Sequence, residues 1–386
     1  LGWAVSSPVE SSPDDNYHLG SIWCPRPSGD SCQTSVVDGD PVVRVPIAVA
    51  DESMRCYVLQ SNKSAGCALG YDDSHMVWSK RFDNGAYPIG YYHFHHLLVG
   101  KDVQTSVLVM RGVNVLIAVA VLGAVGLCAP HGLRRPFIGA IVASWVPMGV
   151  YFIASNNPSS WAVSGLMAYS SATYMATQQK GRRRIALVLC AVIGAVMCLT
   201  SRYDAAFFLL VVGLALLFVV PWKRGGWIGL SALAGVAVLG GVTFMASSQV
   251  SKVAYFLRVF EASDPATSAD KQPFFEKLLV GLETAPKYLG GFWGHTWTPG
   301  WHDVPLGARA PYVLTIMAAG AFVAISLRRG GWRKWTALMI LVGSMCLLPA
   351  LFYANGAMDT IELYQARYIF PLLAPTFFLM LAVDQD

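Results

Sequence analysis

Apolar residues run along this sequence in long, almost uncharged stretches that short polar segments separate. Most stretches are about 17 to 23 residues long, enough for a helix to cross a hydrocarbon core of about 30 Å. The expected spans are 106–128, 137–154, 160–177, 185–200, 205–221, 227–246, 310–327, 336–353 and 367–384. Because a helix satisfies its own backbone hydrogen bonds in lipid, the pattern predicts an all-α polytopic membrane protein.

The composition agrees with this prediction. Hydrophobic residues make up 54% of the chain and charged residues 13%. In soluble domains, roughly one quarter of all residues are charged. The balance therefore favours lipid as the solvent of most of the chain.

Lys and Arg fall in alternate loops between the spans, which sets the expected orientation. They are Arg134, Arg135, Lys180, Arg182, Arg183, Arg184, Lys223, Arg224, Arg328, Arg329, Arg333 and Lys334. Cytoplasmic loops retain an excess of Lys and Arg, so these loops are expected in the cytoplasm. The formal net charge of +5 largely reflects this topology and gives no support for a nucleic-acid partner.

Two long segments are expected on the opposite, extracytoplasmic side. The expected plan is an outer loop with an acidic motif over 1–105, membrane helices over 106–246, a second outer loop over 247–309 and membrane helices over 310–386. Short β-like runs at 42–49 and 54–59 predict mixed structure in the first loop. Residues 1–5 look like the end of a further span and 382–386 leave the last one, so we expect a piece of a longer protein.

The cysteines divide between the first outer loop and the spans. Cys24, Cys32, Cys56 and Cys67 lie in the loop, where an oxidising compartment permits two disulfides. Three pairings are open, and Cys24 with Cys32 and Cys56 with Cys67 is the simplest. The others, Cys128, Cys190, Cys198 and Cys346, lie in or at the ends of spans and are expected to pack there.

The strongest candidate for chemistry is the run from Ser12 to His18 in the first outer loop, which contains Asp14 and Asp15. Two readings are open. Either carboxylate suits the start of a helix, where Asp is a preferred cap. A carboxylate fixed there is also well placed to take a proton from a hydroxyl group, as a general base does.

This acidic pair resembles that of the GT-C superfamily of membrane glycosyltransferases, which use lipid-carrier sugars. Pro13, Asp14, Asp15 and His18 are similar to the Pro-Asp-Glu…His element of a bacterial membrane-protein family of unassigned function. The likeness extends sparsely over the chain, through Tyr87, Pro88, Tyr91, Tyr92, Arg111, Asn114, Gln365, Ala366, Arg367, Tyr368 and Pro371. Asp15 stands where Glu is commoner, and Asp14 to Tyr17 also resemble the acidic pair of mycobacterial-type arabinofuranosyltransferases.

The resemblance implies a GT-C-like fold in a bacterial plasma membrane, and the residues of the first outer loop predict a mixed, disulfide-pinned domain. It implies transfer of a sugar, with arabinofuranose as one candidate, from a polyprenyl-phosphate donor to a glycan, glycolipid or protein acceptor of the cell envelope. By analogy Asp14 is the catalytic base and Asp15 supports it. No cofactor is indicated.

A lipid phosphate leaving group gains negative charge as the glycosidic bond breaks, so a fixed outward-facing cation is expected to stabilise it. The outward candidates are Arg81, Arg111, Arg202, Arg258, Arg309 and Arg367. Arg367, followed by Tyr368, is the best match, although interfacial arginines also extend to lipid head groups. Arg202 has Asp204 as a neighbour, and Arg111 lies inside a span, where charges are usually functional or paired.

Histidine and tryptophan residues supply the remaining candidates. His93, His95 and His96 lie close together, but their spacing fits no specific metal site, so none is expected. His18, Tyr92, His96, His295 and Trp297 are expected to contact substrate. For His295 and Trp297 the alternative is an aromatic anchor at the membrane interface.

Two other functions compete with sugar transfer. A transporter or flippase of a lipid-linked or small solute would use intramembrane charges such as Arg111, and an envelope scaffold would only present the outer loop. Transporters usually show polar or broken helices near the middle of the bilayer. Here the polar residues collect near the expected outer surface, which favours chemistry at the interface.

Overall fold

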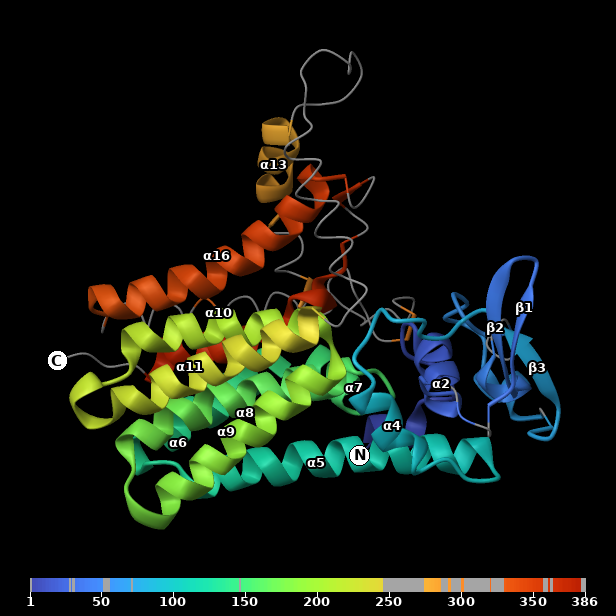
Figure 1. Ribbon diagram of the computed structural model, residues 1–386, viewed down its shortest axis with the longest axis horizontal. Coiled ribbons are helices and arrows are strands. Elements are labelled where there is room, and N and C mark those ends of the chain that lie inside the picture. The colour runs from blue at the N-terminus through green and yellow to red at the C-terminus, as the bar shows by residue number, and fades with distance from the viewer. Residues whose placement is uncertain are drawn as a thin grey trace.

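The computed structural model describes residues 2–27, 29, 32–50, 56–70, 72–145, 147–245, 274–285, 291–292, 300–301, 320, 330–356, 360–361 and 364–382. These residues form a bundle of long helices with a smaller part, containing short helices and a sheet, at one end (Figure 1). The second expected outer loop, 247–309, lies largely outside the described residues.

Most expected spans correspond to helices whose bounds differ by a few residues. They are α5 (Val103–Cys128), α8 (Ser159–Gln178), α9 (Gly181–Ser201), α10 (Tyr203–Val219), α11 (Trp222–Met245) and α16 (Trp332–Ala354). The span at 310–327 lies outside the described residues, apart from position 320. A further helix, α13 (Phe274–Glu283), packs on α16, where Gly281 meets Ala350.

Two expected spans are interrupted, in both cases at prolines. The span at 137–154 is divided into α6 (His131–Trp145) and α7 (Met148–Ile153), with Pro147 between them. The span at 367–384 begins with two 3-10 turns, Ala366–Tyr368 and Phe370–Leu372, before α17 (Leu373–Ala382). Proline lacks an amide donor and disfavours helix in the preceding residue, which explains both interruptions.

Among the described residues, three helices, α5, α9 and α16, are long and apolar enough to cross a membrane by length and composition. Shorter apolar helices cover Tyr203–Val219, Gly226–Val242 and Phe370–Ala382. The predicted spans at 205–221, 227–246 and 367–384 correspond to these shorter helices, because hydropathy alone does not show where a helix begins.

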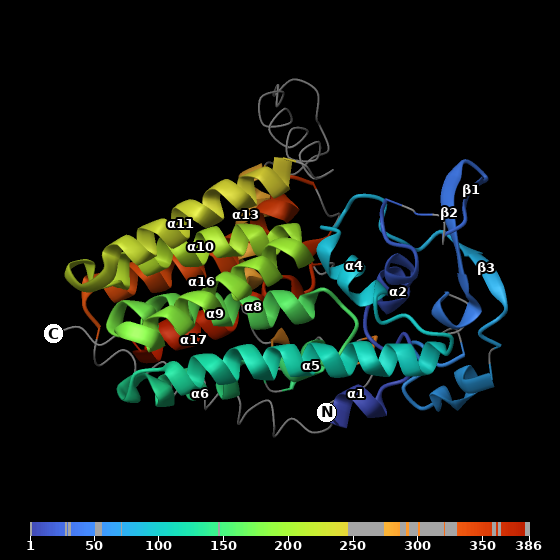
Figure 2. The same cartoon turned by 60° about the horizontal axis from the view of Figure 1, so that its bottom comes forward.

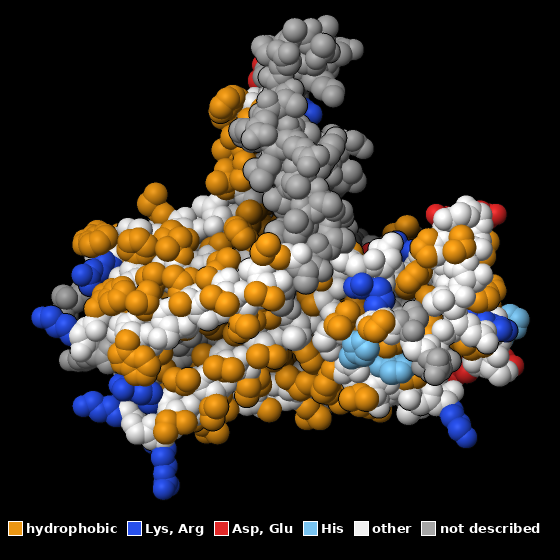
Figure 3. Space-filling model, in the orientation of Figure 1, with side chains coloured by type: hydrophobic (Ala, Val, Ile, Leu, Met, Phe, Trp, Pro, Cys, Tyr) orange, Lys and Arg blue, Asp and Glu red, His pale blue; other side chains and the backbone are white. Residues whose placement is uncertain are grey.

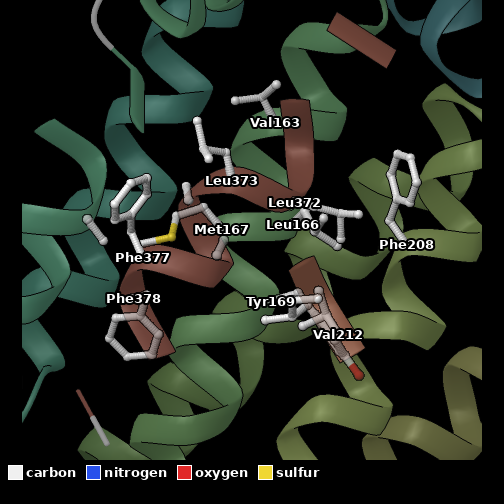
Figure 4. Packing of buried hydrophobic residues seen from close by; sticks show 14 of the residues in the cluster. Val163, Leu166, Met167, Tyr169, Phe208, Val212, Leu372, Leu373, Phe377 and Phe378 are labelled. Atoms are coloured by element: carbon white, nitrogen blue, oxygen red, sulfur yellow. The ribbon is translucent and has the colours of Figure 1, made fainter. Parts of the chain in front are cut away.

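Helix α8 runs through the centre of the bundle and is buried along almost its whole length. Its hydroxyl groups bond back to the helix, as when Ser164 donates to the Ser160 carbonyl and Ser171 to the Met167 carbonyl. Helix α17 packs against α6, α8 and α16. Figure 4 shows its residues Phe377 and Phe378 in one buried core with side chains of α8 and α10. This core fixes where the chain that precedes α17 must lie.

The smaller part contains α1 (Gly2–Ser6), α2 (Asp15–Trp23), α4 (Gly90–His96) and a sheet. Strands β1 (Thr34–Val37), β2 (Asp40–Pro46) and β3 (Met76–Ser79) pair antiparallel in the order β1-β2-β3. The run predicted at 42–49 is thus a strand followed by a 3-10 turn, Ile47–Val49. At 54–59 the prediction was wrong where it can be checked, because residues 56–59 form a turn.

Disulfides join Cys24 to Cys32 and Cys56 to Cys67, which confirms the simplest pairing. Figures 1 and 2 agree in placing α2 and α4 between the bundle and the sheet. Figure 3 shows Lys and Arg side chains at the bundle end away from the sheet and a largely hydrophobic band between the two ends. The distribution is that expected of a membrane protein whose sheet end lies on one side of the bilayer.

Candidate active site

Asp14 lies at the start of α2 in a backbone conformation that few side chains adopt. Its φ is 64°, in the left-handed region, which Asp tolerates better than most residues. Its carbonyl oxygen accepts a hydrogen bond from the amide of His18 at 3.0 Å. Its side chain makes no capping hydrogen bond, however. The carboxylate of Asp14 is therefore directed to other partners.

Two arginines from distant parts of the chain hold that carboxylate. Arg367 donates to its Oδ2 at 2.5 Å, and Arg81 lies 3.5 Å from its Oδ1. Arg367 is itself buried and donates to the Pro13 carbonyl at 3.1 Å. The Asp14 side chain keeps 35% of its surface exposed.

The charges around Asp14 keep it ionised. Burial by itself raises the pKa of this carboxyl group, but the positive charges beside it, led by Arg367, outweigh burial and lower the pKa below its usual value. An ionised, partly accessible carboxylate beside a guanidinium group is thus the central feature of the site.

Asp15 has entirely different surroundings. Its side chain is fully buried, accepts hydrogen bonds from the amide and hydroxyl of Ser12, and lies 3.5 Å from Arg111. Arg111 also donates to the carbonyls of Ser7 and Pro8 at 2.5 and 2.7 Å. Burial raises the pKa of Asp15 by more than Arg111 and Ser12 lower it. Asp15 and Arg111 therefore fasten the N-terminal segment to α5 and lie apart from the Asp14 carboxylate.

His18 lies on the first turns of α2, close to Asp14. Its Nδ1 is 2.9 Å from the Tyr92 hydroxyl of α4, and its ring meets the edge of Tyr87 at a centroid distance of 5.1 Å. Burial lowers the pKa of His18 to about 3, against the attraction of Asp14. The imidazole is consequently neutral at physiological pH.

Arg202 adds a second guanidinium group at the corner between α9 and α10. It forms a bidentate pair with Asp204, at 2.8 and 2.5 Å, and donates to the Ser159 hydroxyl at 2.8 Å. Its guanidinium carbon lies about 6 Å from the rings of Tyr87 and Tyr368. The guanidinium group is buried and its position is fixed by these partners, so Arg202 forms one side of the site.

Most of the predicted site residues that the structure describes come together. Asp14, His18, Tyr92, Arg202, Arg367 and Tyr368 form one cluster, in which Arg367 also lies over the Tyr368 ring at 5.1 Å. His96 lies apart, because its Nδ1 is 2.8 Å from the Ile22 carbonyl and joins α4 to α2. His295 and Trp297 lie outside the described residues.

The cluster also contains Tyr17 and Tyr87, which were not predicted to contact substrate, and Arg81, which was predicted only as one of six outward cations. The Arg81 guanidinium lies 5.6 Å from the Tyr17 ring, and the Tyr17 hydroxyl donates to Asp83. Gly20 lets this loop approach α2, since a Cβ at Gly20 would lie 2.5 Å from the Arg81 carbonyl oxygen. Position in the outer loop was the available signal for Arg81, and it did not separate Arg81 from other outward arginines.

The grouped histidines of α4 have separate partners. His93 contacts the Arg26 carbonyl at 2.7 Å, and His95 contacts the Asn114 side chain at 3.0 Å. Within the described part of the chain, no three His, Cys, Asp or Glu side chains are grouped so that they could hold a metal ion.

The charge balance of the cluster suits an anionic ligand. Three guanidinium groups, those of Arg81, Arg202 and Arg367, face two carboxylates, those of Asp14 and Asp204. Asp204 neutralises Arg202. Arg81 and Arg367 are held by Asp14 and can exchange it for another anion. An entering phosphate can compete with Asp14 for them.

The comparisons with known proteins concern the whole chain. No curated protein and no solved structure matches it. A family model described as "Predicted membrane protein (DUF2142)" matches residues 1–376. The apolar helices and the match over nearly the full length lead to one conclusion: the chain belongs to this family of membrane proteins.

Proposed function

We propose that this protein is a glycosyltransferase that moves a sugar from a polyprenyl-phosphate donor to a cell-envelope acceptor at the outer face of the membrane. The observation that carries the proposal is the contact between Asp14, an accessible carboxylate, and Arg367, a buried guanidinium group. A base for the acceptor and a cation for the departing phosphate are the two charges that this reaction needs.

In the proposed reaction, the oxygen of an acceptor hydroxyl forms a bond to the anomeric carbon of the donor sugar. The bond between that carbon and the phosphate oxygen breaks, and the phosphate keeps the electron pair. Asp14 takes the hydroxyl proton, while Arg367 and Arg81 stabilise the charge that grows on the phosphate. Arabinofuranose is one candidate for the sugar, in keeping with the acidic motif.

The Asp14–Arg367 contact gives the donor a second role. While Arg367 holds Asp14, the pKa of this carboxyl group is lowered and its basicity is weak. A donor phosphate that draws Arg367 and Arg81 to itself removes the main cause of the lowered pKa. Asp14 then becomes a stronger base in the complex that contains the donor.

The neighbouring residues support this assignment. His18 is neutral and hydrogen-bonded to Tyr92, so it forms no ion pair with Asp14. The rings of Tyr17, Tyr87 and Tyr368 offer flat faces on which a sugar can stack. Arg202, which Asp204 and Ser159 hold in place, packs beside the rings of Tyr87 and Tyr368. These features suit a sugar phosphate better than a simple inorganic anion.

An apolar cavity of about 460 Å³ lies between α5, α6 and α7 and suits a prenyl chain. Ile153 and Ala154 line it, and three residues further on Asn157 donates to the Pro13 carbonyl, which Arg367 also contacts. A prenyl chain in this cavity would lie beside the segment that connects Ala154 to Asn157, and so close to the charged cluster. The transporter alternative relied on Arg111, whose guanidinium group instead contacts the N-terminal segment and Asp15.

Replacement of Asp14 by asparagine tests the proposal. Asp14→Asn keeps the size of the side chain and removes its basicity, so transfer from a polyprenyl-phosphate sugar in proteoliposomes should fall by about 10²–10⁴-fold. Asp38→Asn is the matched control, because Asp38 also has a positive φ, 54°, but lies in the exposed β1–β2 turn. Transfer by Asp14→Asn at the rate of the Asp38→Asn protein would refute the role of Asp14.

A further inference from the structure

A second charged cavity lies at the end of the bundle away from the sheet. It has a volume of about 560 Å³. Its lining consists of Thr177, Gln178, Gln179, Lys180, Arg184 and Lys223. These residues come from the end of α8, the start of α9 and the start of α11, so two separate loops supply the positive charges.

The cations of this cavity are not neutralised by the described part of the protein. Lys180, Arg184 and Lys223 form no ion pair with any described residue, and no Asp or Glu lines the cavity. The retention of Lys and Arg in cytoplasmic loops explains the sign of these charges. This rule does not require the three cations to line one cavity. Their mutual repulsion there favours a bound anion.

The wall of the cavity is held in place by hydrogen bonds. Gln179 donates its side-chain amide to the Cys128 carbonyl, at the end of α5, at 3.1 Å. The Nε of Arg184 donates to the backbone carbonyl of Gln179 at 2.7 Å, which leaves the two terminal nitrogens of the guanidinium group for a ligand. The site therefore exists before an anion arrives.

Aromatic residues indicate the depth of this cavity in the bilayer. Trp222 precedes Lys223 directly and is 50% exposed, and Trp227, five residues later on α11, is 65% exposed. Exposed tryptophan at the ends of apolar helices marks the level of the lipid head groups. The two tryptophans thus indicate that the cavity lies at the depth of a phospholipid phosphate.

We propose that this cavity binds the phosphate group of an anionic phospholipid from the leaflet opposite to the sheet. Lys180 and Lys223 supply point charges, Arg184 supplies two directed donors, and the side chains of Thr177 and Gln178 contact the remaining head group. The lipid joins the α8–α9 and α10–α11 loops and so stabilises the bundle at this end. The inference is independent of the proposed enzyme activity.

The test compares the full chain in nanodiscs of phosphatidylcholine with nanodiscs of equal parts phosphatidylcholine and phosphatidylglycerol. Wild-type protein should unfold about 2–4 °C higher in the presence of phosphatidylglycerol. Lys180→Gln and Lys223→Gln should each lose most of this gain. Arg135→Gln is the matched control: it removes an exposed positive charge from α6, on the same side of the membrane and outside the cavity, and should retain the gain.

Several results would overturn the proposal. They are equal unfolding temperatures in the two lipids, an equal loss in Arg135→Gln, or the same gain from inorganic phosphate added to phosphatidylcholine nanodiscs at matched ionic strength. The last result would assign the cavity to a soluble anion. Native mass spectrometry of the protein released from the mixed nanodiscs gives a second readout, in which retained phosphatidylglycerol should decrease in both lysine variants.

Discussion

At the scale of single residues, adjacent carboxylates have opposite electrostatic surroundings. Asp14 turns to Arg367 and Arg81, which lower its pKa, while Asp15 turns into the protein, where burial raises its pKa. The left-handed backbone of Asp14 separates the directions of the two side chains. One residue therefore faces the site, and its neighbour holds the N-terminal segment.

A pH dependence of stability follows from His18. Its pKa is about 3 in the folded protein and about 6.5 in the unfolded chain. Below pH 6.5 the unfolded chain binds a proton that the folded protein does not, so stability is complete above pH 6.5 and declines toward pH 3. The decline is about 1.4 kcal/mol per pH unit. Unfolding temperatures measured in detergent between pH 7.5 and pH 4.5 should show it.

Glutamine at position 18 checks the assignment. His18→Gln keeps a hydrogen bond to Tyr92 available but does not titrate, so its unfolding temperature should fall less steeply with decreasing pH. His75→Gln, at an exposed histidine, should follow the wild-type slope. A wild-type slope in the His18→Gln protein would show that His18 does not cause the decline.

At the scale of elements, two glycines set the approach of α8 and α9. A Cβ at Gly194 would lie 2.5 Å from the Gly165 carbonyl oxygen and 2.8 Å from the Tyr169 amide. Small residues commonly permit such contacts between membrane helices. Since α9 ends at Ser201, directly before Arg202, and α8 begins at Ser159, this crossing also holds Arg202 in the site.

Alanine at Gly194 should therefore destabilise the bundle. The new methyl group meets backbone atoms that cannot move away, so Gly194→Ala should lower the free energy of unfolding by about 1–3 kcal/mol. Gly235→Ala on α11 is the matched control, because nothing lies within 4 Å of a Cβ there. Unfolding of both variants in detergent, followed by tryptophan fluorescence, makes the comparison; equal stabilities would contradict the close crossing.

At the scale of the whole molecule, charge and hydrophobicity divide the structure into two ends and a band. The basic loops lie at one end and the sheet with both disulfides at the other (Figures 1 and 3). Disulfides persist in oxidising compartments, and Lys and Arg are retained in the cytoplasm. Both rules lead us to expect the sheet outside the cytoplasm and the basic loops inside it.

Cysteine labelling in intact cells tests this orientation. Ser35→Cys, on exposed strand β1, should react with a membrane-impermeant maleimide, whereas Lys180→Cys, in the α8–α9 loop, should react only after the cells are permeabilised. The wild-type chain measures the background from Cys128, Cys190, Cys198 and Cys346. The reverse pattern of labelling would contradict the orientation.

The sequence by itself determined the helical membrane class, most helix positions and the candidates Asp14, His18 and Arg367, and it made one of three disulfide pairings the simplest. These depend on local patterns: hydropathy over a helix length, cysteine spacing and a short acidic motif. The helix interruptions at Pro147 and Pro371 also have a local signal, the proline itself. The prediction followed the continuous hydropathy instead and placed one span across each proline.

Only the tertiary structure decided which charges meet. Arg367 reaches Asp14 because 3-10 turns precede α17. The position of these turns is fixed by the packing of Phe370–Leu372 against α8 and α10 and of α17 against α6 and α8. Separation of Asp15 from Asp14, and the presence of Arg81 in the site, depend on contacts between segments far apart in the chain. Such contacts leave no periodic trace in a single sequence, because each partner alone resembles any other polar residue near a membrane surface.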